Sequence, residues 1–314
     1  MRRQRGLALA AITLTSILWG TTGTAATFAS DAGPLAIGAA ALGIGGILQA
    51  LVAIPALKRS RGQLRAQLPT VMLGAGAVAI YPLAFYSSMS LAGVALGSVV
   101  SLASAPLASG LLERFVHHQK LSRLWLLAAG LGIAGSALLC LSKISHGANS
   151  GGAILSGVGL GLIAGAAYAI YSWCAQRLMS QGIDRAASMG AVFGAGGTLL
   201  LPVLLFTGAP LLESGQAFAV AAYMALIPMF LGYLLFGYGL ARVPVSTATT
   251  ITLSEPAIAA ILAVVVVGER LSPLGWSGLG IIAAALVMLA IAPATNELPV
   301  PLADPGEPAL FSGS

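Results

Sequence analysis

One carboxyl side chain, Glu255, lies near the middle of a long apolar stretch of this 314-residue sequence. If that stretch spans a membrane, a charge there costs about 2.5–3.5 kcal/mol on insertion scales. A water-filled cavity would offset the cost, and so would a proton, because a neutral carboxylic acid is cheaper to bury than a carboxylate. The competing interpretation is a structural tie, in which a protonated Glu255 bonds to a neighbouring helix or to a backbone group freed by Pro256.

Hydroxyl and aromatic side chains also occur deep within apolar stretches. Ser101 and Ser104 are three residues apart and share a helix face, and Tyr168 and Tyr171 have the same spacing. Aromatic rings with a few polar groups suit a small amphipathic solute or an organic cation. For any single hydroxyl, close packing of small residues is the competing interpretation. We expect a central cavity lined by Trp19, Tyr81, Ser101, Tyr168, Tyr171, Thr252 and Glu255.

Signatures of catalysis or of cofactor binding are missing from the sequence. There is no P-loop, no Ser/His/Asp arrangement and no zinc-ligand spacing. Glycine-rich runs such as 157–161 lie in apolar stretches without an adjacent lysine, which indicates close helix packing. Cys140 and Cys174 are interpreted as small apolar packing residues. We expect no cofactor, no metal and no enzymatic activity.

The composition excludes a soluble globular protein, because 58% of the residues are apolar and only 8% are charged. Ordinary soluble domains carry about 25% charged residues, and disordered chains are poor in apolar ones. A bilayer core needs about 20 apolar residues of helix. The sequence therefore predicts an all-α membrane protein with ten transmembrane helices, in the windows 6–29, 35–57, 69–88, 91–112, 124–142, 153–175, 186–207, 217–240, 245–267 and 274–293.

The basic residues predict the orientation in the membrane. With the N-terminus inside, every one of the fifteen Lys and Arg residues except Lys143 and Arg270 falls on the cytoplasmic side. This asymmetry predicts a multi-pass protein of the plasma (inner) membrane with both termini cytoplasmic. It also explains the net charge of +6 through contact with anionic lipid headgroups, so no nucleic-acid partner is needed. The first window is interpreted as a retained helix, with cleavage as a signal peptide as the alternative.

Two parts of the sequence resemble each other. Ala105-Pro106 matches Glu255-Pro256 at an offset of 150, and Trp19 matches Tyr168 at an offset of 149. The halves 1–145 and 153–293 would each hold five helices, followed by a disordered cytoplasmic tail, 294–314. An odd number of helices gives two inverted repeats, an arrangement typical of secondary transporters. Pro106 and Pro256 would break their helices.

Several motifs of the sequence resemble a known family. They are Ile17-Leu18-Trp19-Gly20, Ser254-Glu255-Pro256, Gly268-Glu269-Arg270-Leu271-Ser272-Pro273 and the glycines Gly278 and Gly280. Together they resemble the EamA-like branch of the drug/metabolite transporter superfamily. The first half departs from the pattern, because Ala105 stands where the second half has Glu255. The resemblance implies a ten-helix basket around a central cavity and transport of small metabolites, often amino acids, across the plasma membrane.

We therefore expect a secondary transporter that works by alternating access, with efflux of a small metabolite as the favoured direction. Its partners would be the solute, the lipid bilayer and, as a candidate coupling ion, the proton. The alternative is a membrane scaffold or assembly partner that transports nothing. The sequence does not indicate the identity of the solute or an oligomeric state.

Overall fold

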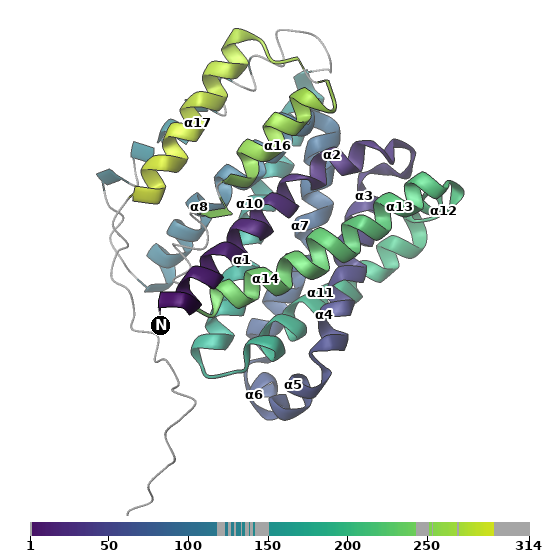
Figure 1. Ribbon diagram of the computed structural model, residues 1–314, viewed down its shortest axis with the longest axis vertical. Coiled ribbons are helices and arrows are strands. Elements are labelled where there is room, and N and C mark those ends of the chain that lie inside the picture. Colours follow the sequence, from purple (N-terminus) through teal and green to yellow (C-terminus); the bar gives the residue numbers. More distant parts are fainter. Residues whose placement is uncertain are drawn as a thin grey trace, which may run out of the picture.

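The computed structural model describes residues 2–117, 151–242, 251–252, 254–268 and 270–291, together with single positions between 123 and 141. This part of the chain is a bundle of helices without strands (Figure 1). In chain order the helices are α1 (Arg2–Gly20), α2 (Thr22–Thr27), η1 (Ser30–Ala32), α3 (Gly33–Gly38), η2 (Ala39–Ile44), α4 (Gly45–Val52), α5 (Ile54–Arg59), α6 (Arg61–Ala66), α7 (Leu68–Ala92), α8 (Val94–His117), α10 (Gly151–Ser180), α11 (Arg185–Thr207), α12 (Pro210–Glu213), α13 (Gly215–Met224), η3 (Ala225–Leu231), α14 (Gly232–Leu240), α16 (Ser254–Val265) and α17 (Pro273–Ile291).

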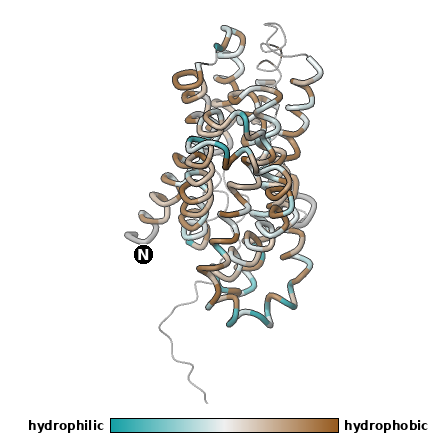
Figure 2. The backbone as a smooth tube through the Cα atoms, turned by 90° about the vertical axis from the view of Figure 1, so that its right-hand side faces the viewer, coloured by the Kyte–Doolittle hydropathy of each residue, from teal (hydrophilic) through white to brown (hydrophobic). Residues whose placement is uncertain are grey.

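Seven helical stretches of the described residues are long and apolar enough to cross a membrane. They are Gly6–Thr27, Ser30–Val52, Leu68–Ala92, Val94–Leu112, Gly151–Ser180, Arg185–Thr207 and Gly215–Leu240. Figure 2 shows hydrophobic residues along the helices and hydrophilic ones gathered at the short helices α5 and α6 at the lower end. The prediction of an all-α membrane protein is confirmed.

The other three predicted windows are less completely described. Most of window 124–142, residues 245–250 of window 245–267 and the tail 294–314 lie outside the described residues. Helix α17 occupies the last window, but its described apolar stretch, Pro273–Ala285, is shorter than a span. The count of ten helices in two repeats stays a prediction.

A tight hairpin joins α7 to α8, as the adjoining windows 69–88 and 91–112 require. Only Met89 and Ser90 separate these two windows, but α7 continues through both residues. The chain reverses at Gly93, whose φ of +88° is accessible to glycine at little cost. A Cβ at Gly97 would lie 2.6 Å from the Cα of Met89, so the two helices are in close contact directly beside the turn.

Helix α10 packs on α7 and α8 through one glycine face. Gly157, Gly161 and Gly165 recur every four residues and lie on the same side of α10. A Cβ at Gly157 would lie 2.8 Å from the Cβ of Ala92, and one at Gly165 would lie 2.7 Å from the carbonyl oxygen of Ser101. These glycines therefore pack helices together, as expected from the sequence.

Helix α1 packs on α14 and α16 in a similar way. A Cβ at Gly232 would lie 2.8 Å from the indole nitrogen of Trp19, and the Thr15 hydroxyl donates to the Gly232 carbonyl at 3.1 Å. A Cβ at Gly20 would lie 2.6 Å from Cγ2 of Ile258. Because α14 and α16 come from the second half of the chain, α1 is held mainly by residues more than 200 positions away.

Two π-helical segments, η2 and η3, interrupt the stretches Ser30–Val52 and Gly215–Leu240 and contact each other. Pro228 lies inside η3. At their junction a Cβ at Gly45 would lie 2.7 Å from the Cβ of Met229. π-Helical turns are rare and are frequent at functional sites. Two of them thus lie at the contact between the halves.

Charged residues separate to the two ends of the bundle. Lys58, Arg59, Arg61 and Arg65 lie on α5 and α6, and the contact of Ala53 with Gly190 puts these helices beside the Arg185 end of α11. Asp31 on η1 and Glu213 on α12 lie at the opposite end, where these two elements meet.

Candidate functional site

A buried cluster of aromatic rings occupies the contact between the halves of the chain. Trp19 meets Tyr168 edge to face, with ring centroids 6.2 Å apart. Tyr81 lies 5.8 Å from Tyr168 and 5.6 Å from Tyr171. All four rings are less than 10% exposed. The structure therefore brings together the four aromatic residues that the sequence assigned to the site.

Hydrogen bonds hold part of this cluster in place. The indole N–H of Trp19 donates to the carbonyl oxygen of Pro228 at 2.9 Å, which joins α1 to the π-helical segment η3. The hydroxyls of Tyr171 and Tyr233 lie 2.7 Å apart and join α10 to α14. These two hydrogen bonds thus hold in place rings that come from distant parts of the chain.

Glu255 is 3% exposed and belongs to the same region. It is close enough to interact electrostatically with Tyr81, Tyr86 and Tyr168, and also with Tyr233. Within the described ranges no basic side chain forms an ion pair with it. Thr252, one turn earlier, lies beside the Tyr168 hydroxyl. The buried acid is thus next to the rings.

Two phenol groups near Glu255 are buried without a hydrogen bond of ordinary geometry. They are the hydroxyls of Tyr86 and Tyr168, although Thr22 lies beside the first and Thr252 beside the second. Buried polar groups usually have partners, and leaving one unpaired costs about 1–3 kcal/mol. A solute or a water molecule that enters the cluster would gain these hydrogen bonds.

The remaining sequence-based assignments lie apart from the rings or in continuous helix. Ser101 is buried between α8 and α10, and its hydroxyl donates to the carbonyl oxygen of Gly97 at 2.7 Å. It lies against Gly161 and Gly165 of α10. Pro106 lies inside α8 and Pro256 inside α16. Their roles as helix breaks stay predictions.

Sequence reasoning missed several members of the cluster. Tyr233 and Phe193 have ring centroids 4.4 Å apart, and Phe236 lies 5.1 Å from Trp19. It also missed Gln49, which is 2% exposed and whose amide nitrogen and oxygen have no hydrogen-bond partner. The sequence does contain a signal for this residue, because Gln49 is the one residue with an amide side chain in window 35–57.

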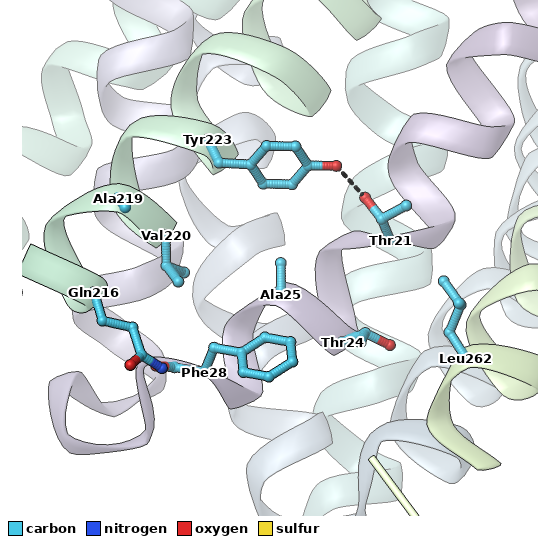
Figure 3. A pocket seen from close by; sticks show the side chains of 9 residues that line it. All are labelled: Thr21, Thr24, Ala25, Phe28, Gln216, Ala219, Val220, Tyr223 and Leu262. Atoms are coloured by element: carbon cyan, nitrogen blue, oxygen red, sulfur yellow. Dashed lines mark hydrogen bonds between the residues drawn. The ribbon is translucent and has the colours of Figure 1, made fainter. Parts of the chain in front are cut away.

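A cavity of about 540 Å³ lies between α2, α13 and α16, towards the end of the bundle that carries Asp31 and Glu213. Figure 3 shows the hydrogen bond between the hydroxyls of Thr21 and Tyr223, 2.7 Å apart, at one side of it. At another side the Gln216 amide donates to the Phe28 carbonyl at 2.9 Å. The volume is that of a small-molecule site. None of the predicted site residues lines it; its walls are Thr21, Thr24, Ala25, Phe28, Gln216, Ala219, Val220, Tyr223 and Leu262.

The chemistry of the region is that of recognition and desolvation. Among the described residues no group of three or more His, Cys, Asp or Glu side chains gathers to hold a metal ion. The cluster offers aromatic faces, unpaired hydroxyls and one carboxyl group. Such a set can bind a small polar or cationic solute out of water.

Comparison of the sequence with known proteins gives matches to transporters. Residues 6–141 and 155–291 each match the EamA-like transporter family. The sequence is 33% identical to the uncharacterized transporter YwfM of Bacillus subtilis over 283 residues, which cover 90% of this chain and 93% of that protein. It is 30% identical to the threonine/homoserine exporter RhtA of Escherichia coli over 205 residues, 63% of each protein. A solved crystal structure with 18% identity has a TM-score of 0.64 and covers 90% of this chain and 95% of its own, which shows a common fold.

Proposed function

Because this chain belongs to the EamA-like transporter family, we propose that it is a secondary transporter that exports a small metabolite across the plasma membrane by alternating access. The membrane embedding and the transporter family are established by the family match and the apolar helices. The direction, the solute and the coupling are the proposed parts.

The observation that carries the proposal is the buried cluster built from both halves of the chain. Trp19 and Tyr81 come from the first half, and Tyr168, Tyr233 and Glu255 come from the second. A solute held among them contacts both halves at once. Movement of one half against the other then changes the side from which the solute can leave.

Three features support an inverted arrangement of the halves. The family model matches two consecutive stretches of similar length. In the order of the ten predicted windows, the first (α1) packs on the eighth (α14) and the ninth (α16), and the sixth (α10) packs on the third (α7) and the fourth (α8). One set of pairs becomes the other when every window number is shifted by five. The basic residues of α5, α6 and α11 share one end, which we assign to the cytoplasm.

The cluster suits a solute that carries an ammonium group. The faces of Trp and Tyr rings attract cations, and the carboxyl group of Glu255 would pair with an ammonium. Free amino acids have this group, and the relative RhtA is named as a threonine/homoserine exporter. We therefore propose an amino acid or a related amine as the exported solute, with the cavity of Figure 3 as its outer exit.

Glu255 would also couple export to the proton gradient. A carboxyl group in a dry site favours the protonated form, whereas an ammonium or water beside it favours the charged form. Binding of a proton and binding of the solute would then exclude each other. Export of the solute would then be linked to import of protons.

Flux measurements in proteoliposomes test this proposal. Vesicles loaded with radiolabelled threonine are compared with and without an imposed pH gradient. The unchanged protein should release the label faster with the gradient, and Glu255→Gln should lose this acceleration, because the amide keeps the shape of the side chain and cannot titrate. Glu213→Gln, the same substitution at an exposed acid on α12, serves as the matched control.

Each alternative function has its own outcome. Flux that responds to the gradient equally in Glu255→Gln would reject proton coupling through this residue, whereas flux through the unchanged protein that ignores the gradient would leave a uniporter. No flux of threonine or of other amino acids and amines from vesicles with correctly folded protein would favour the non-transporting scaffold.

A further inference from the structure

Two arginine side chains share one aromatic ring at the basic end of the bundle. The guanidinium carbon of Arg242 lies 3.7 Å from the ring centroid of Tyr238, and that of Arg185 lies 6.0 Å from the same centroid. Nη1 of Arg242 also donates to the carbonyl oxygen of Tyr238 at 3.0 Å. The ring and these contacts hold the two cations where α11 packs against α14.

The positive charge at this place is only partly balanced by the described protein groups. The two guanidinium groups are within electrostatic range of each other, and Asp184 is the described acid that acts on Arg185. Its carboxylate caps α11 by accepting from the backbone N–H groups of Ala186 and Ala187 at 2.8 and 3.1 Å. Among the described residues, no ion pair is formed by Arg185 or Arg242. Two cations held together in this way favour an anion beside them.

We propose that Arg185, Tyr238 and Arg242 form a binding site for the phosphate of an anionic phospholipid. Arginine guanidinium groups bind phosphate through two or more charge-assisted hydrogen bonds. Basic pockets between membrane helices on the cytoplasmic side are suited to anionic headgroups. A second arginine–aromatic pair lies in the C-terminal part of α10, where the Arg177 guanidinium is 5.2 Å from the ring centroid of Trp173.

The position in the fold favours a lipid over a soluble anion. Tyr and Trp rings near helix ends mark the headgroup layer of a membrane. Tyr238 lies in the last turn of α14, and Trp173 lies about two turns before the end of α10. Arg185 is half-buried at the start of α11, so part of its side chain is already out of bulk water. The acidic residues of the C-terminal sequence, Glu297, Asp304 and Glu307, are the competing occupant within the chain.

Native mass spectrometry of the full-length protein tests the site. Delipidated protein is titrated with phosphatidylglycerol or with phosphatidylcholine, and the bound lipids are counted. We expect a preference for phosphatidylglycerol that each of the substitutions Arg185→Gln and Arg242→Gln weakens about fivefold, equivalent to about 1 kcal/mol per arginine. The controls are Arg59→Gln and Arg61→Gln, made one at a time, each of which removes one charge from an exposed position of α5 or α6.

Several outcomes would overturn the proposal. An equal loss in the control pair would mean diffuse attraction instead of a site. Equal competition by glycerol phosphate would mean a site for free phosphate, and much tighter lipid binding after neutralisation of Glu297, Asp304 and Glu307 would mean that the tail occupies it. If the glutamine variants do not fold, Arg185→Lys and Arg242→Lys decide, because lysine keeps the positive charge but loses the paired hydrogen bonds of a guanidinium group to phosphate, so the preference for phosphatidylglycerol must still fall.

This inference does not depend on the solute or on its coupling. A protein that exports no amino acid could still bind the lipid, and an active exporter could lack the site. The lipid titration and the flux assay therefore fail separately.

Discussion

Two helix crossings in this protein correspond to each other in sequence and differ in chemistry. Helix α1 crosses α16, and helix α10 crosses α8. The offsets of 149 and 150 relate Ser16 to Gly165 and Ser254 to Ser104. In the first crossing Ser254 lies 2.9 Å from Ser16, Oγ to Oγ, whereas in the second the Ser104 hydroxyl lies directly against Gly165. A polar pair at one crossing is replaced by close backbone packing at the other.

The next residue along each helix makes the difference sharper. Ala105 and Glu255 correspond at the offset of 150, and both are 3% exposed. The α10–α8 crossing buries a methyl group there, and the α1–α16 crossing buries a carboxyl group. A carboxyl group costs far more to bury than a methyl group. The comparison therefore assigns a packing role to one crossing and the ionisable chemistry of the site to the other.

The corresponding rings Trp19 and Tyr168 differ in the same way. They contact each other, but the indole N–H is hydrogen-bonded to Pro228, and the phenol hydroxyl has no bond of ordinary geometry. Trp19 is thus part of the framework, whereas the Tyr168 hydroxyl lies beside Thr252 and within electrostatic range of Glu255. Substitutions at the two rings and at the two crossings test these differences.

Trp19→Ala should have the largest effect on stability. The substitution removes ring contacts with Tyr168, Tyr233 and Phe236 and leaves the Pro228 carbonyl without its donor. Truncation of a buried Trp costs about 3–5 kcal/mol. Denaturant unfolding in mixed micelles measures the loss.

Tyr168→Phe is the matched variant on the other ring. It removes a hydroxyl that lies beside Thr252 without a hydrogen bond of ordinary geometry, so stability should change little. Threonine flux should nevertheless fall if that hydroxyl contacts the solute. Similar destabilisation by Trp19→Ala and Tyr168→Phe would remove the distinction between framework and site.

Gly165→Ala should have the next largest effect, because the new methyl group would meet the Ser104 hydroxyl and backbone atoms of Ser101 and Ala105. Backbone atoms cannot rotate away, and overpacking of this kind costs about 1–3 kcal/mol. Gly159→Ala on the same helix has no heavy atom within 4 Å of its new Cβ, and it should be neutral or slightly stabilising. Thermal unfolding of the two variants gives the comparison, and equal midpoints would contradict the tight α10–α8 contact.

The sequence was sufficient for the spans and for part of the cluster. Uninterrupted apolar windows predicted all seven described spans because membrane helices must be about 20 residues long. The repeat offset singled out Trp19 and Tyr168, and the structure brings these rings into contact. Glu255 was evident because a carboxyl group is rare in an apolar span.

The rest depends on three-dimensional contacts that no local pattern records. Ser101 looked equivalent to the other hydroxyls, but its partner is the carbonyl of Gly97 on its own helix. Phe193 and Phe236 join the cluster only because α11 and α14 pack beside it. The residues around the cavity of Figure 3 come from α2, α13 and α16, and their spacing in the sequence gives no sign of a common site.

Ser254→Ala and Ser104→Ala should produce the smallest effects, and they compare the crossings directly. Ser254→Ala removes the contact with Ser16, but the Ser16 hydroxyl still lies 3.3 Å from the Ile251 carbonyl, so one acceptor remains. Interhelical hydrogen bonds of this kind contribute about 0.6 kcal/mol on average in a membrane. Ser104→Ala removes only a bond within α8, to the Ser101 carbonyl, and relieves the contact with Gly165. Its midpoint of thermal unfolding should therefore equal or exceed that of the unchanged protein, and a larger loss for Ser104→Ala than for Ser254→Ala would reverse the assignment of the two crossings.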